Sequence, residues 1–262
     1  MRTVFRIRTR SGAADRLYLV PNAESPASAA SDLRRLADAL AGAEPLNWVI
    51  TGDSITHGLV HTQGGRSYPE HLHELIRGEL GRVRDIVINS AISGHRIVDI
   101  LGDWERRVSS WRPDVVTLMI GTNDMSTGGV WPIISADDYA ASLHEFVSRV
   151  RALGAVPVLQ TPPSIDALNA PERARVVEFA DAVRAVAARD DVILVDQLAR
   201  FTELGGGRVP WGLMDDPFHP NATGHAALAV ELAKALGIRP EPLRSRTLGR
   251  LEGLVEAAGA RG

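Results

Sequence analysis

Five short apolar runs alternate with amphipathic segments along the central part of the chain. Nearly every residue of each run is apolar, which is typical of strands buried on both faces of a sheet. The segments between the runs carry apolar residues at helical spacing. This alternation predicts a single α/β domain with a doubly wound, flavodoxin-like sheet of about five parallel strands flanked by helices. The strands are expected within 46–54, 85–94, 114–124, 155–164 and 191–197, and the helices within 67–80, 96–110, 136–153, 171–189 and 221–237.

The N-terminal part of the chain is expected to form a small extension of this domain. Residues 4–9 alternate apolar and polar side chains and residues 17–20 form a short apolar run, a pattern that favours an N-terminal β-hairpin. A loop rich in alanine, serine and proline follows. A helix is then expected from Ser31 to Gly42, because a capping residue and a glycine bracket an amphipathic segment.

The C-terminal tail carries another amphipathic pattern, which follows two prolines and predicts a helix. Such a helix could pack on its own domain or mediate self-association, so the chain is expected to be a monomer or a homo-oligomer. Its apolar positions are Leu248, Leu251, Leu254 and Val255. The chain is thus divided into an extension at 1–45, an α/β domain at 46–237 and a tail at 238–262.

Composition narrows the class of protein. Of the 262 residues, 45% are hydrophobic and 23% are charged, which is ordinary for a globular domain. The net charge of −3 and the lack of a long basic run argue against a nucleic-acid partner. The chain contains no cysteine, which excludes disulfides, thiolate metal sites and a cysteine nucleophile.

The sequence pattern favours a cytoplasmic protein. Residues 1–31 contain no continuous apolar stretch of the kind that a secretory signal requires. Elsewhere no apolar stretch approaches the roughly 18–20 residues that span a bilayer. We therefore expect a cytoplasmic location and no stable membrane association, although a mature secreted protein would show the same pattern.

Chemically useful side chains follow three of the expected strands. Ligands of open parallel sheets bind at the carboxyl ends of the strands, so these residues are expected to meet at one edge. The first strand ends near Ser54, the second near Gly94 and the third near Asn123, while His219 lies in a proline-flanked loop before the helix expected at 221–237. A hydroxyl, an imidazole, a nearby carboxylate and an amide are the groups that acyl transfer requires.

Each of these residues also has a purely structural interpretation. Ser54, at a strand-to-helix junction, could be only an N-cap, and Asn123 could be only a turn residue. His219 could be a surface residue, but a carboxylate on its own loop could orient its imidazole towards a serine hydroxyl. Both Asp215 and Asp216 are available for that role, and their spacing alone does not choose between them.

Taken in order, four sequence blocks resemble those of the SGNH (GDSL-type) hydrolase family. The blocks are VITGDSITHG at 49–58, INSAISG at 88–94, MIGTNDM at 119–125 and DPFHP at 216–220. The resemblance runs from about residue 46 to residue 237 and includes all four blocks at the expected spacing.

The resemblance implies a serine esterase that works through an acyl-enzyme and requires no cofactor. Ser54 would be its nucleophile and His219 its base, with Asp216, rather than Asp215, as the carboxylate partner of the histidine. The resemblance also implies an oxyanion hole formed by the backbone N–H groups of Ser54 and Gly94 and by the side chain of Asn123.

A metal site is not expected. His57 and His61 are four residues apart and could meet on a helical face, but the segment lacks the glutamate of an H-E-x-x-H motif and contains glycines typical of a loop. Several residues in or beside the expected active edge are candidates for contact with a small-molecule ester substrate. They are Asp53, His57, His95, Met125, Trp131, Trp211 and Phe218.

The leading hypothesis for function is hydrolysis of a small carboxylic ester, such as an acetylated sugar or another short-chain ester. A lysophospholipase, a thioesterase or an acyltransferase could use the same residues, and the apolar volume near Ser54 would separate long from short acyl groups. A non-catalytic binding module on this fold is an alternative of a different class. An active-site-directed fluorophosphonate that failed to label Ser54 would favour it.

Overall fold

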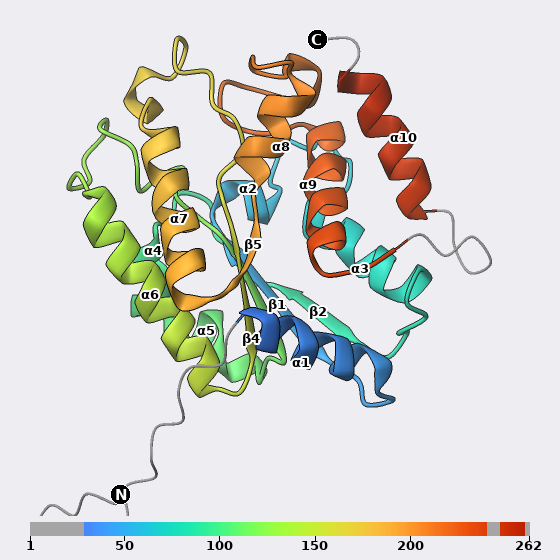
Figure 1. Ribbon diagram of the computed structural model, residues 1–262. Helices are drawn as coiled ribbons and strands as arrows, with labels where there is room; N and C mark the ends of the chain where they lie inside the picture. The colour runs from blue at the N-terminus through green and yellow to red at the C-terminus, as the bar shows by residue number, and fades with distance from the viewer. Residues whose placement is uncertain (1–28, 240–246, 260–262) are drawn as a thin grey trace, which may run out of the picture.

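A parallel sheet with the strand order β2-β1-β3-β4-β5 forms the centre of the molecule (Figure 1). Every neighbouring pair of strands is parallel, which confirms the predicted flavodoxin-like, doubly wound architecture. The computed structural model describes residues 29–239 and 247–259, so the hairpin expected from 4–9 and 17–20 lies outside the described residues. The strands are β1 Asn47–Gly52, β2 Ile86–Asn89, β3 Val115–Met119, β4 Val156–Gln160 and β5 Ile193–Val195.

Helices cover both faces of this sheet (Figure 1). On one face, Trp48 and Ile50 of β1 join an apolar cluster with residues of α1, α3, α9 and α10. On the other face, Val49 joins a second cluster with residues of α4, α6 and α7. Alternate residues of one strand therefore enter two cores, which is why the strand runs are apolar throughout. The α-helices are α1 Ala29–Ala41, α2 Ser54–His57, α3 Tyr68–Gly78, α4 Ile97–Gly102, α5 Trp104–Arg107, α6 Ala136–Ala152, α7 Val176–Asp190, α8 Gln197–Leu204, α9 Ala222–Ala235 and α10 Thr247–Gly259, and the 3₁₀ turns are η1 Ser109–Trp111, η2 Pro171–Arg173 and η3 Trp211–Leu213.

Three elements differ from the sequence expectations. The helix expected at 96–110 is divided into α4, α5 and η1, because Asp103 (φ −111°, ψ 35°) and Val108 (φ −133°, ψ −64°) leave the helical conformation. The strand expected within 85–94 is the short β2, which lies at the edge of the sheet with Ile86 56% exposed. Helix α8 was not expected. Its start is fixed by Asp196, whose side chain accepts a hydrogen bond of 3.1 Å from the N–H of Ala199.

The predicted C-terminal helix is present as α10 and packs on its own chain. Leu248, Leu251 and Val255 are buried in the cluster that also contains α9 and α3. Leu254 is 47% exposed and points away from this contact. Of the two roles expected for the helix, the structure therefore shows the packing of its apolar face against its own domain.

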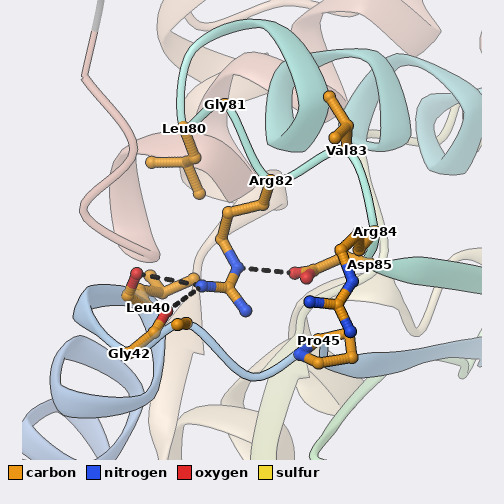
Figure 2. Close-up of a pocket in the computed structure, with 10 residues that line it drawn as sticks. Leu40, Gly42, Pro45, Leu80, Gly81, Arg82, Val83, Arg84 and Asp85 are labelled. Atoms are coloured by element: carbon orange, nitrogen blue, oxygen red, sulfur yellow. Dashed lines mark hydrogen bonds and ion pairs between the residues drawn. The ribbon is translucent and has the colours of Figure 1, made fainter.

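An arginine ties α1 to the edge of the sheet where the strands begin. Figure 2 shows Arg82 reaching from the loop after α3 to the carbonyl oxygens of Leu40 and Gly42 at the end of α1, at 3.1 and 2.8 Å. Its Nε donates to Asp85 at 2.8 Å. The cavity of about 300 Å³ beside it is lined by residues that precede β1 and β2, so it lies at the edge opposite Ser54.

Within the ranges 29–239 and 247–259, none of the helices combines the length and the apolar character that crossing a membrane would need.

Candidate active site

Ser54 is the first residue of α2, directly after β1. The chain passes close to β3 here, since a Cβ atom on Gly52 would lie 2.2 Å from the carbonyl oxygen of Met119. Asp53, rather than Ser54, caps α2: its side chain accepts a hydrogen bond of 3.0 Å from the N–H of Ile55. The hydroxyl of Ser54 is therefore not used as a helix cap and can bond to another group.

Ser54, His219 and Asp216 form a continuous chain of hydrogen bonds. Oγ of Ser54 lies 2.8 Å from Nε2 of His219. Nδ1 of the same ring lies 2.7 Å from Oδ2 of Asp216. The other oxygen of Asp216 accepts hydrogen bonds from the backbone N–H groups of Phe218 and His219, at 2.9 and 2.8 Å. An imidazole held at Nδ1 by a carboxylate can accept the serine proton at Nε2.

The environment sets the charges of this pair. Burial lowers the pKa of His219 below its ordinary value, although the hydrogen bond and charge of Asp216 act in the opposite direction. Partial burial would raise the pKa of Asp216, but hydrogen bonds from the N–H of Phe218 and from the His219 ring outweigh it and lower that pKa. At neutral pH the pair is therefore a neutral imidazole and a carboxylate, the state in which a histidine can act as a base.

Asp215 has a different partner. Its Oδ2 lies 2.9 Å from Nδ1 of His61, and its Oδ1 accepts a hydrogen bond of 3.1 Å from the amide of Gln63. His61 in turn stacks on His219, with ring centroids 3.6 Å apart. Of the two aspartates that spacing left open, Asp216 is the one that contacts the imidazole of His219, as the sequence resemblance implies.

Side-chain hydrogen bonds join the loops after β2 and β3 to this centre. Nδ1 of His57 lies 3.2 Å from Oγ of Ser93, the neighbour of Gly94. The amide of Asn123 donates to the carbonyl oxygen of His95, the residue after Gly94, at 3.1 Å. An amide nitrogen carries two hydrogens, so a second donor of Asn123 is available to another acceptor.

A buried arginine supports the same loop. Arg107 is 1% exposed and donates to Nδ1 of His95 at 2.7 Å and to the carbonyl oxygen of Gly52 at 3.1 Å. Burial, and then the charge of Arg107, lowers the pKa of His95, so its ring is neutral and carries its hydrogen on Nε2. We did not identify Arg107 from the sequence, because a lone arginine in an amphipathic segment resembles a surface residue.

The expected substrate contacts divide according to their exposure. Asp53 and Met125 are buried, at 1% and 0% exposure, and lie behind the surface of the site. Trp131 and Trp211 are 63% and 49% exposed. Phe218 is half-buried and lies beneath the guanidinium of Arg173, which is 3.8 Å from the ring centroid. Of the other two, His57 is the last residue of α2 and His95 lies on the loop after β2.

The site does not fit a metal ion. In the described part of the chain, His61, Asp216 and His219 are the one group of three or more His, Cys, Asp or Glu whose ligand atoms cluster, within 4.8 Å of one another. The two imidazole planes are inclined by only 9°, so their nitrogen lone pairs lie in separate parallel planes and cannot both point at one ion. His57, which the spacing pairs with His61, contacts Ser93 instead.

Residues 50–227 match the GDSL-like Lipase/Acylhydrolase family. The chain is 29% identical over 209 residues to an acetylxylan esterase of Geobacillus stearothermophilus, which covers 74% of this chain and 94% of the relative. A solved structure of an acetylxylan esterase from that organism matches with a TM-score of 0.64 and 25% identity, over 74% of this chain and 95% of the other. An α/β hydrolase enzyme from the metagenome of Lake Arreo, Spain, matches with a TM-score of 0.64 and 28% identity, over 77% of this chain and 100% of the other.

Further structures of the Geobacillus esterase carry substitutions described as catalytic at a serine, an aspartate and a histidine, the last two separated by three positions. Asp216 and His219 have that same spacing in this chain. The family match includes three of the sequence blocks in full and all of the first except Val49, and the fold with its parallel five-stranded sheet matches the solved structures. The chain is therefore an ester-bond hydrolase and belongs to the GDSL-like lipase/acylhydrolase, or SGNH hydrolase, family.

Proposed function

We propose that the chain is a serine esterase that removes a short acyl group, such as acetyl, from a hydroxyl group of a carbohydrate. The hydrogen-bond chain from Ser54 through His219 to Asp216 carries the proposal. It lies at the carboxyl end of β1. The next two strands of the chain, β2 and β3, lie on opposite sides of β1, and open α/β sheets bind their ligands at such a switch point. The acetylxylan esterase relative supports an acetylated sugar as the substrate.

The reaction has two halves. Oγ of Ser54 attacks the ester carbonyl carbon while Nε2 of His219 accepts the hydroxyl proton. The oxyanion accepts hydrogen bonds from the backbone N–H groups of Ser54 and Gly94 and from the amide of Asn123. His219 then gives its proton to the departing oxygen as the ester C–O bond breaks, which releases the alcohol. Water, deprotonated by His219, attacks the acyl-serine ester. The bond between the acyl carbon and Oγ of Ser54 breaks, His219 returns its proton to Oγ, and the carboxylic acid is released. Asp216 stabilises the imidazolium in both halves.

Exposed aromatic and histidine side chains are the proposed contacts with the sugar. Trp131 and Trp211 are 63% and 49% exposed, and ligand sites combine such apolar side chains with a few polar groups. His57, His95 and Phe218 complete the set. Asp53 and Met125 are left out of it, because their side chains are buried.

Replacing Ser54 with Ala should abolish turnover of p-nitrophenyl acetate, because the attacking oxygen is lost while the cap of α2 on Asp53 remains. The measurement is the initial rate, with thermal unfolding to show that the fold is intact. Fluorophosphonate should label the unmodified protein and not the Ser54→Ala variant. Substantial turnover by that variant would contradict the nucleophile assignment.

The substrate class is tested with a chain-length series of p-nitrophenyl esters beside acetylated xylo-oligosaccharides and acetylated glucose. We expect kcat/KM to be highest for acetyl and to fall with longer acyl chains, with acetate released from the acetylated sugars. A preference for long acyl chains would indicate a lysophospholipase or thioesterase. Transfer of the acyl group to an added alcohol in preference to water would indicate an acyltransferase.

A further inference from the structure

The imidazole of His219 has a second imidazole lying flat against it. His61, from the loop between α2 and α3, stacks on it with ring centroids 3.6 Å apart and planes inclined by 9°. The side chain of His61 is only 22% exposed, so the rest of its surface is covered by the protein. Because His61 follows the helix that begins with Ser54, the stack joins the two segments that carry the nucleophile and the base.

His61 is itself held by a carboxylate. Its Nδ1 lies 2.9 Å from Oδ2 of Asp215 and 3.8 Å from Oδ2 of Asp216. The other oxygen of Asp215 accepts a hydrogen bond of 3.1 Å from the amide of Gln63, on the same loop as His61. Consecutive aspartates therefore hold consecutive layers of the stack: Asp215 holds His61, and Asp216 holds His219.

The aspartate loop is closed by its own backbone. The N–H of Asp215 donates to the carbonyl oxygen of His219 at 2.8 Å. A movement of Asp215 or His61 is therefore transmitted to His219 by a direct contact, without passing through the core of the domain.

A base that accepts and returns a proton twice in each turnover needs a fixed ring plane. If the ring of His219 tilts about its side-chain bonds, the 2.8 Å contact of its Nε2 with Oγ of Ser54 is lost. A flat neighbour at stacking distance opposes that tilt.

Building on the proposed role of His219 as the base, we propose that His61 is a positioning residue for the reaction. Its stacked ring fixes the plane of His219 between Ser54 and Asp216, and Asp215 holds His61 in place. In this role His61 acts through His219, so its replacement affects the rate of the chemical steps rather than the binding of the ester.

The test compares His61→Ala and His61→Phe with the unmodified enzyme on p-nitrophenyl acetate. We expect His61→Ala to lower kcat by about tenfold or more, since small misplacements of a catalytic group have effects of this order, and to leave KM within about twofold. His61→Phe keeps a flat ring but loses the bond to Asp215, so it should restore kcat in part and be faster than His61→Ala. An unchanged kcat in His61→Ala, or a His61→Phe variant as slow as His61→Ala, overturns the proposal.

A second pair of variants tests whether His61 positions His219 even if His61→Ala does not fold. Asp215→Ala removes the carboxylate that holds His61 and should lower kcat in the same direction, whereas Asp215→Asn keeps an acceptor oxygen and should restore it. Equal rates for these two variants count against the proposal. The matched control is His144→Ala on α6, a 53% exposed histidine also paired with a carboxylate, at 2.6 Å from Asp190, and its kcat should not change.

Ser54→Ala in the same assay separates the two proposals. A Ser54→Ala variant as active as the unmodified enzyme means that the proposed function itself is wrong. An inactive Ser54→Ala variant together with a fully active His61→Ala variant means that only the role of His61 is wrong.

Discussion

Asn123 is the residue whose replacement best separates catalysis from substrate binding. Its amide donates to the carbonyl of His95 and retains one free donor, which we assign to the oxyanion. Because the oxyanion develops only in the transition state, Asn123→Ala should lower kcat by about 100-fold or more and leave KM nearly unchanged. Steady-state kinetics measure both constants, with Asn169→Ala as an exposed asparagine control. A rise in KM without a fall in kcat would make Asn123 a binding residue only.

The residues of the site differ in how far the sequence could reveal them. Ser54, His219 and Asn123 lie in blocks that resemble those of a known family, and this resemblance, rather than residue type or spacing alone, predicts their roles. The stacking of His61 on His219 and the bond from Arg107 to His95 arise from tertiary packing. Neither His61 nor Arg107 lies in a sequence pattern that would indicate its partner.

Two buried carboxyl groups flank the nucleophile and the oxyanion amide. Burial raises the pKa of Asp53 to about 7 and that of Asp124 to about 7, from an ordinary value of 3.8. The folded protein therefore holds protons that the unfolded chain releases between about pH 4 and pH 7. Their contribution to folding stability is highest at the acidic end and is lost as the pH rises through that window.

Replacing Asp124 with Asn removes this ionisation and should make the protein more stable than the unmodified form at pH 8, with a smaller difference at pH 4. Asp53→Asn should act in the same direction, because asparagine also caps helices well. Thermal unfolding at the two pH values measures the effect as a difference between variant and unmodified protein. The contributions of the other carboxylates to stability are the same in both proteins and cancel in this difference. A difference that is the same at both pH values would show that neither group titrates on unfolding.

Among the secondary-structure elements, the sequence pattern indicates where a helix lies better than it indicates whether that helix is continuous. The amphipathic pattern of 96–110 continues through a break that the backbone makes at Asp103. Helix α8 was missed because its apolar residues directly follow the β5 run, and only the cap formed by Asp196 marks the boundary. Local hydrogen bonds, rather than the spacing of apolar residues, decide both cases.

The packing of α10 on its own domain can be tested with two leucines of one helix. Leu248 is 0% exposed in the cluster shared with α9, whereas Leu254 is 47% exposed. Leu248→Ala should lower the free energy of unfolding by about 2–4 kcal/mol, because it leaves a cavity in a packed interface. Leu254→Ala should change it by less than about 0.5 kcal/mol. Denaturant unfolding measures both, and equal effects would argue against this packing.

For the whole molecule, the fold was predictable because every central strand is apolar on both faces. Trp48 and Val49 enter different clusters on opposite sides of the sheet, so burial on both faces could be read from the run itself. The attachment of α1 could not be read in this way. It involves Arg82, which donates to backbone carbonyl oxygens that any sequence would present, together with an ion pair of 2.7 Å between Arg151 of α6 and Asp32 of α1.

The position of β2 at the edge of the sheet has a consequence for solubility. In the described part of the chain, β2 pairs only with β1, which leaves its outer side as a template for another strand. Val83 and Ile86 are 73% and 56% exposed beside it, a combination that favours aggregation. Two features oppose this: β2 is only 4 residues long, and the charged Arg84 precedes it. Natural proteins protect an open edge with short strands and charged side chains. Lengthening β2 or removing the charge of Arg84 should therefore promote aggregation.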